Sequence, residues 1–150
     1  MRSNTTGQAR VYRRSRADRY GDAVFMFLAR IGIGPCHLLT TRGRKTGQPH
    51  TNPVVLVKRN GQRWLVAPYG AVAWVHNARA AGTVTLRRGR EVADYAIREV
   101  LPVEAGPVLK RYLAVAAAAR PYFKADKDSP VEEFVAEARR HPVFALTPRA

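Results

Sequence analysis

The chain has 150 residues, of which 46% are apolar and 25% are charged, a balance that excludes a disordered chain and fits one folded domain. A single cysteine, Cys36, excludes an intrachain disulfide and is compatible with a reducing compartment. Lysine and arginine number 26 against 11 aspartate and glutamate residues, and the resulting net charge of +15 favours an anionic partner.

The first part of the chain is basic. We expect residues 1–15 to form a flexible basic arm and residues 16–150 to form a single domain. Apolar residues recur every three or four positions between Arg16 and Ile33, which predicts an amphipathic helix. A basic helix of this kind can contact an anionic membrane peripherally, although packing on its own domain is the commoner case. We predict a cytoplasmic protein, with membrane association left open.

The rest of the chain reads as strands interrupted by helices. Asn60-Gly61 is the signal of a two-residue type I′ hairpin between two strands. Ser129 to Glu132 has the pattern of a helix capping box. The expected strands are residues 37–41, 51–59, 62–67, 83–88, 91–100 and 142–146, and the expected helices are residues 73–81, 107–119 and 130–140. Because an antiparallel sheet of six strands has edges to protect, we expect it to close into a β-barrel with helices outside, a mainly β fold of the α+β class.

The densest chemical signal is the loop from Arg42 to His50. Three cations, Arg42, Arg44 and Lys45, lie within four positions beside two glycines, while Thr46 and Gln48 add hydrogen-bond donors. Guanidinium groups bind phosphate and carboxylate in bidentate fashion, so the loop favours an anion site. The glycine order is not that of a Walker A loop, and a solvated basic hairpin explains the same residues equally well.

A second group follows the third expected strand. The tight turn from Ala67 to Gly70 leads into Trp74, His76 and Asn77 at the start of a helix, where backbone amides and an indole face can line a pocket. The alternative is that Trp74 packs in the core. The chain shows no nucleophile elbow, no acid/base pair and, since none of its four histidines has zinc-ligand spacing, no metal site. This favours a cofactor that carries the reactivity.

Three segments, LLTTRGRKTGQPHTNPVVLV, NGQRWLVA and WVHNARAAGTVTLRRGR, resemble the deazaflavin-dependent nitroreductase family. The resemblance runs from Leu38 to Arg90. It implies a split β-barrel like that of FMN-binding proteins and the cofactor coenzyme F-420, an 8-hydroxy-5-deazaflavin, with FMN as a weaker alternative. It further implies hydride transfer to a small-molecule acceptor of the quinone, enone or nitro type.

The resemblance also implies roles for individual residues. It places Arg44, Lys45 and His50 at the phosphate and oligoglutamate tail, with Asn52 and Pro53 beneath the cofactor. It assigns the ring and ribityl chain to Ala67, Tyr69, Trp74, Asn77 and Ala78. Tyr122 aligns with a tyrosine on the substrate side, and it is our candidate for the catalytic donor.

Two departures from the family bear on function. His50 stands where relatives carry arginine, so we expect weaker and pH-sensitive tail binding, because imidazole titrates near neutrality. The loop from Ala67 to Trp74 is short and carries Tyr69 where relatives have a lysine, which argues against nitroimidazole reduction.

Two other classes of function stay open on sequence alone. One is a protein that binds the deazaflavin or a hydrophobic ligand without turnover, and the other is a basic binder of membrane surfaces or nucleic acid. We expect no nucleic-acid binding, because aromatic residues do not alternate with the basic ones. The sequence is compatible with a monomer or a homodimer.

Overall fold

The structure, a computed structural model, describes residues 36–149, so the expected N-terminal arm and amphipathic helix lie outside the described residues. Six strands are present, and each matches an expected strand to within a few residues. They are β1 (Cys36–Arg42), β2 (Pro49–Arg59), β3 (Gln62–Val66), β4 (Thr83–Arg88), β5 (Glu91–Glu99) and β6 (Val143–Pro148).

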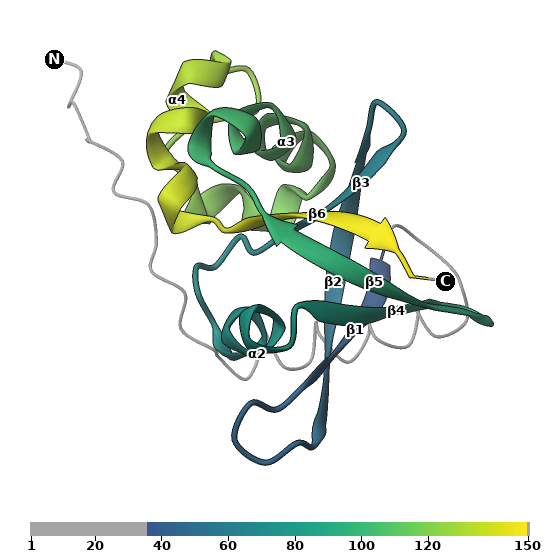
Figure 1. Cartoon of the computed structure of the whole chain (residues 1–150). Coiled ribbons are helices and arrows are strands. Elements are labelled where there is room, and N and C mark those ends of the chain that lie inside the picture. The colour runs from purple at the N-terminus through teal and green to yellow at the C-terminus, as the bar shows by residue number, and fades with distance from the viewer. Residues whose placement is uncertain (1–35, 150) are drawn as a thin grey trace, which may run out of the picture.

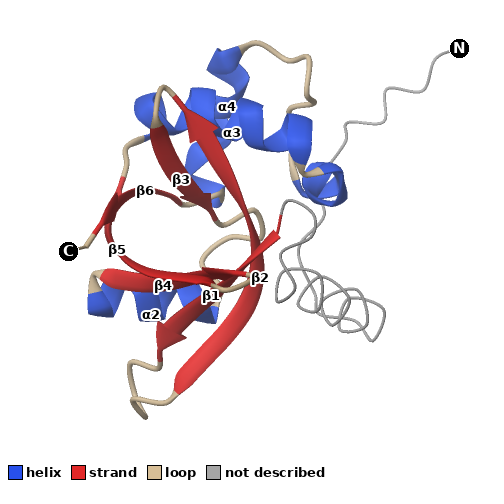
Figure 2. Cartoon of the chain, turned by 90° about the vertical axis from the view of Figure 1, so that its right-hand side faces the viewer, coloured by secondary structure: helices blue, strands red, loops and turns tan. Residues whose placement is uncertain are grey.

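The strands form a closed barrel in the order β1-β2-β3-β6-β5-β4, and every neighbouring pair is antiparallel. Figure 2 shows the strands as a ring with helices on its outer side. Closure leaves no unpaired edge strand, which is the physical reason for expecting a barrel. The prediction of a mainly β barrel with flanking helices is confirmed.

The hairpin between β2 and β3 has the predicted turn. Asn60 has φ 53° and Gly61 has φ 74°, and Arg59 pairs with Gln62 across the turn. Positive φ at both central positions defines the type I′ turn, whose twist matches that of the flanking strands. This turn sets the register in which β2 and β3 build the wall of the barrel.

Two hydrophobic clusters lie on opposite faces of β3 and β6. Leu65 and Phe144 belong to the cluster that every strand of the barrel contributes to. Their neighbours Trp64 and Val143 belong to the second cluster, which joins the outer face of the barrel to the helices. Successive residues of a strand point to opposite faces, so these two strands are apolar on both sides.

The helices are α2 (Ala73–Ala81), α3 (Pro102–Val115) and α4 (Val131–Glu137), with 3-10 turns η1 (Ala117–Tyr122) and η2 (Ala138–Arg140). α3 and α4 pack together on one side of the barrel, while α2 covers the opposite side (Figures 1 and 2). Among the described residues, no helix is long and apolar enough to cross a membrane.

Two expectations about these helices were wrong. The helix expected over 107–119 spans Pro102–Val115, so it begins five residues earlier, because proline is favoured in a first turn, where no amide hydrogen is needed, and it ends four residues earlier, before η1. The capping box at Ser129 is absent: Pro130 occupies the N-cap position, and the Ser129 hydroxyl instead accepts the backbone N–H of Asp126 at 2.9 Å. A turn upstream of the helix therefore uses the side chain that the pattern assigned to the cap.

Candidate functional site

The loop between β1 and β2 is folded tightly on itself. The backbone N–H of Gly43 donates to the carbonyl of Gln48 at 2.8 Å, and that of Gly47 donates back to the carbonyl of Gly43 at 2.8 Å. A Cβ atom at Gly43 would lie 3.0 Å from His50 Nε2 and from Thr46 Oγ1. Glycine at this position thus lets the loop close around the side chains of Thr46 and His50.

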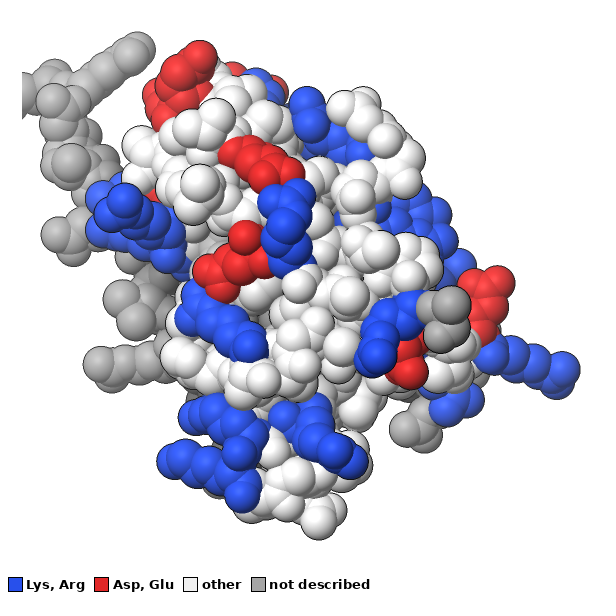
Figure 3. Space-filling view, in the orientation of Figure 1, with Lys and Arg blue, Asp and Glu red and all other residues white. Residues whose placement is uncertain are grey.

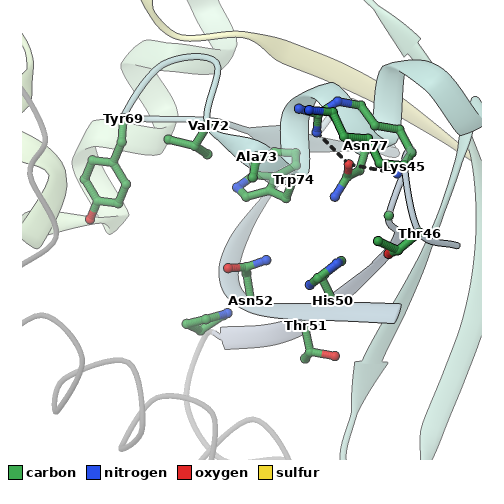
Figure 4. Close-up of a pocket in the computed structure, with 13 residues that line it drawn as sticks. Lys45, Thr46, His50, Thr51, Asn52, Tyr69, Val72, Ala73, Trp74 and Asn77 are labelled. Carbon is green, nitrogen blue, oxygen red and sulfur yellow. Dashed lines mark hydrogen bonds between the residues drawn. The ribbon is translucent and has the colours of Figure 1, made fainter. Parts of the chain in front are cut away.

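Helix α2 holds this loop through Asn77. The Asn77 Oδ1 atom accepts hydrogen bonds from the backbone N–H of Arg44 at 3.2 Å and from Arg44 Nη1 at 2.9 Å. Asn77 is 4% exposed, whereas Arg44 is exposed. Because the amide oxygen is committed to Arg44, the amide nitrogen is left to face the cleft beside it (Figure 4).

A cleft of about 600 Å³ lies between the start of β2, the β1–β2 loop and the start of α2. This volume falls within the range of small-molecule sites. Figure 4 shows Lys45 and Thr46 at one end, Tyr69 at the other and the Trp74 ring between them, while His50 and Asn52 rise from β2. The lining residues are Gly43, Arg44, Lys45, Thr46, His50, Thr51, Asn52, Pro53, Tyr69, Val72, Ala73, Trp74 and Asn77.

The basic end of the cleft is strongly positive. Lysine and arginine side chains gather at the end of the molecule where the β1–β2 hairpin lies (Figures 1 and 3). Within residues 36–149, neither Arg44 nor Lys45 forms an ion pair with a carboxylate, whereas Arg79 is paired with Glu99 at 2.5 Å. The charge at this end is therefore available to an anionic ligand.

A second cavity, of about 440 Å³, adjoins the cleft and shares Pro53, Tyr69 and Trp74 with it. Its remaining wall comes from β1, β2, the end of β3 with Pro68, and the end of α3 with the alanine run that follows. Burial is the largest cause that raises the pKa of the Tyr112 phenol well above its ordinary value, and burial also raises the pKa of the Cys36 thiol. Both groups are therefore neutral, and the cavity favours an apolar ligand.

Tyr69 and Tyr122 meet at the junction of the two cavities. Their ring centroids are 4.8 Å apart with an interplanar angle of 76°, an edge-to-face contact. Tyr69 is 37% exposed and lines both cavities, while Tyr122 is half-buried. Tyr69 lies in the loop after β3 and Tyr122 at the end of η1, 53 positions later, so only the fold brings them together.

The structure gathers most of the residues that the sequence marked. Nine of them line the cleft: Arg44, Lys45, Thr46, His50, Asn52, Pro53, Tyr69, Trp74 and Asn77. Ala67 and Ala78 are buried in the core, and Gln48 is exposed in the hairpin. Tyr122 lines neither cavity, and its ring contacts Tyr69, which lines both. Trp74 fills both roles considered for it, since it is 8% exposed, packs near Phe144 and still lines both cavities.

Sequence reasoning missed the apolar cavity. The run Ala116 to Ala119 that forms one wall was interpreted as the end of a helix, and Cys36 as an isolated thiol. The signal was the run of small side chains after α3, which leaves space that larger residues would fill. Among residues 36–149, no group of three or more His, Cys, Asp or Glu side chains could hold a metal ion.

The sequence pattern of the F₄₂₀H₂-dependent quinone reductase family, named after the reduced form of coenzyme F-420, matches residues 7–135. The chain belongs to this family. The protein is therefore an oxidoreductase whose cofactor is coenzyme F-420. The resemblance seen in the sequence is confirmed at the level of family, cofactor and reaction class.

Solved structures resemble this reductase, and those with TM-scores above 0.5 share its fold. One described as a domain-swapped dimer is 24% identical, with a TM-score of 0.54 and coverage of 89% of this chain and 100% of the other. A FAD-binding protein from Mesorhizobium loti is 12% identical, with a TM-score of 0.51 and coverage of 81% and 86%. An F₄₂₀H₂-dependent reductase, FDR-A, is 28% identical, with a TM-score of 0.47 and coverage of 75% and 94%.

The residues of the cleft fit the cofactor of this family. Its basic end offers donors from Arg44, Lys45 and Thr46, which suit phosphate and carboxylate groups. Its middle offers the Trp74 ring and the inward-facing amide of Asn77, which suit a flat heteroaromatic ring with polar edges. The order of these groups along the cleft, from cations to an aromatic face, matches a molecule that is charged at one end and planar at the other.

Proposed function

We propose that this reductase transfers hydride to a neutral, apolar acceptor of the quinone or enone type, seated in the 440 Å³ cavity. The observation that carries the proposal is the adjacency of two chemically different cavities. The basic cleft and the apolar cavity meet at Pro53, Tyr69 and Trp74, so ligands in the two can touch there. The bound cofactor supplies the hydride from carbon 5 of its reduced deazaflavin ring.

In this proposal the cleft orients the cofactor. Arg44 and Lys45 bind the anionic tail, and His50 assists them from the start of β2. Asn77 secures Arg44 from below and leaves its amide nitrogen to the ring system. Trp74, which lines both the cleft and the cavity, would hold the planar end of the cofactor beside the acceptor, and such positioning lowers the entropic cost of reaction.

The cavity offers the acceptor a mostly apolar lining. Its walls are mostly aliphatic, with the Tyr69 and Trp74 rings where it adjoins the cleft and with buried Tyr112 and Cys36 as neutral polar groups. A charged acceptor would lose hydration there without gaining a partner, whereas a quinone or an enone is neutral until hydride arrives. Negative charge then develops on its oxygen, and a hydrogen bond donated by Tyr122 stabilises that charge.

A cavity-filling variant tests this assignment. Ala117 and Ala114 are both exposed, but Ala117 lines the cavity, whereas Ala114, on the preceding helix, lies outside it. Ala117→Leu should raise the KM for a quinone by roughly tenfold, about 1.4 kcal/mol of acceptor binding, and should leave the Kd of oxidised cofactor unchanged. Ala114→Leu is the matched control. Equal quinone kinetics in the two variants would place the acceptor elsewhere.

The hydroxyl of Tyr122 is tested separately. Tyr122→Phe keeps the ring that contacts Tyr69 and removes the donor. Turnover of a quinone should fall by roughly 10- to 100-fold, about 1.4–2.7 kcal/mol, with cofactor affinity unchanged. Full turnover would assign the donor role to another group.

We also propose that the chain forms a homodimer, the assembly stated for the solved structure of the same fold. Sedimentation velocity at micromolar concentration should give the mass of two chains of 16.7 kDa. A single species at the mass of one chain would contradict this.

A further inference from the structure

A buried histidine lies behind Tyr69 and takes no part in the function proposed so far. His141 follows η2, precedes β6 and is 3% exposed. Its Nδ1 atom lies 2.8 Å from the carbonyl oxygen of Pro68, the residue before Tyr69. Because a carbonyl can only accept, Nδ1 carries a hydrogen and donates it to Pro68.

The same imidazole contacts the segment that carries Tyr122. Its ring stacks on Phe123, the next residue, with centroids 3.8 Å apart and an interplanar angle of 14°. Its Nε2 atom lies 3.2 Å from Oε1 of Glu137, a residue 6% exposed. The Glu137 carboxylate in turn accepts the backbone N–H groups of Lys124 at 2.9 Å and Ala125 at 3.2 Å.

One buried pair thus holds two loops. His141 and Glu137 bind the residue before Tyr69 and the three residues after Tyr122, while the two tyrosine rings touch each other at the junction of the cavities. A second bond, from the Ala67 N–H to the Pro142 carbonyl at 2.8 Å, joins the Tyr69 loop to the strand entry beside His141. Loops are mobile unless such contacts secure them, and a satisfied buried polar network makes its surroundings rigid.

We propose that His141 is a positioning residue for hydride transfer: its hydrogen bond to Pro68 holds Tyr69 against Tyr122 where the cofactor cleft meets the acceptor cavity. The importance of this position rests on the proposed function, because only a reaction at that junction needs the two rings in one place. Misplacement of a reacting group by about 1 Å is sufficient to slow a reaction by about 100-fold.

Two variants separate the hydrogen bonds of His141. In His141→Asn the side-chain amide nitrogen takes the place of Nδ1 and can still donate to Pro68. In His141→Gln it takes the place of Nε2 and reaches Glu137 instead. Both variants lose the stacked ring equally, so a difference between them reports on the bond to Pro68.

The first measurement uses neither cofactor nor acceptor. In protein labelled with ¹³C at tyrosine rings, the Tyr69 signal, assigned by its loss in Tyr69→Phe, should show the ring-current shift of its contact with Tyr122. We expect His141→Asn to retain this shift and His141→Gln to lose it. Any other pattern in two folded variants, including equal behaviour, overturns the proposal.

The second measurement is kinetic. His141→Gln should lower kcat for a quinone by roughly tenfold relative to His141→Asn, with the Kd of oxidised cofactor within about twofold of the native value. Equal kcat in both overturns the positioning role. Absence of quinone reduction by the native protein would instead overturn the proposed function, leaving the NMR result to decide the structural claim.

A third variant covers the case in which one histidine substitution does not fold. Phe123→Leu keeps an apolar side chain and removes the ring stacked on His141. It should shift the Tyr122 signal, because the segment that carries this tyrosine loses the ring packed on His141, while the bond to Pro68 remains. An unchanged Tyr122 signal overturns the claim that the His141 imidazole holds this segment.

Discussion

Asn77 both holds Arg44 and lines the cleft. Its substitution by aspartate should therefore change the affinity for the cofactor while leaving the stability of the fold nearly unchanged. The carboxylate keeps the Oδ1 acceptor that binds both the backbone N–H and the guanidinium of Arg44. A charged hydrogen bond to Arg44 offsets the cost of burying the new charge, and we expect the free energy of unfolding to stay within about 1 kcal/mol of the native value.

Affinity for the cofactor should respond differently. The variant adds a negative charge inside the cleft that receives the anionic end of the cofactor. For a ligand charge about 8 Å away, with an effective dielectric constant of about 20, the repulsion is about 2 kcal/mol, which weakens binding by roughly 30-fold. Asn77→Ala should instead lower both the free energy of unfolding and the affinity for the cofactor. It leaves the Arg44 N–H without its partner and releases the β1–β2 loop.

The assay is a fluorescence titration of oxidised cofactor, paired with urea unfolding. Asn60→Asp is the matched control, because it makes the same change of charge at the β2–β3 turn, away from the cleft lining, where aspartate tolerates positive φ. If Asn77→Asp and Asn60→Asp bind the cofactor equally, the anionic end of the ligand does not lie in this cleft.

Three further changes test charge, packing and burial. Arg44→Ala with Lys45→Ala should weaken cofactor binding by roughly tenfold or more and reduce its dependence on salt, measured by titration at two ionic strengths. Gly106→Ala should cost about 1–3 kcal/mol in urea unfolding, because the added Cβ would lie 2.5 Å from Cγ2 of Val135, and Val135→Ala should restore part of the loss. Burial, the largest influence, lowers the pKa of His141 although its hydrogen-bond acceptors raise it. The unfolded chain therefore binds a proton more readily than the folded one, and the free energy of unfolding should fall as the pH drops below about 6.5. The fall should be less steep in His141→Asn; equal slopes of unfolding free energy against pH in the two proteins would contradict this.

The sequence predicted the barrel because its determinants are local. Strand alternation, the Asn60-Gly61 turn and the helix from Ala73 to Ala81 each depend on neighbouring residues, and each is present in the structure. Helix ends were predicted less well. Ser129 matched a capping pattern, yet its hydroxyl serves a turn three residues earlier, since the same side chain can satisfy either backbone amide.

The basic loop and the Trp74 helix could also be recognised from sequence, because charge clusters and family motifs are properties of short segments. How they combine could not be. The bond between Arg44 and Asn77 crosses 33 residues, and it depends on where barrel closure brings α2.

The apolar cavity and the buried pair behind it were determined by tertiary structure alone. His141, Pro68 and Phe123 are far apart in the chain, and no local pattern distinguishes a histidine that joins two loops from an exposed one. The sequence by itself determined the family, the cofactor and the fold, because these depend on motifs and periodicity. Only the fold decided which side chains meet at the junction of the two cavities, because such contacts depend on how distant segments pack.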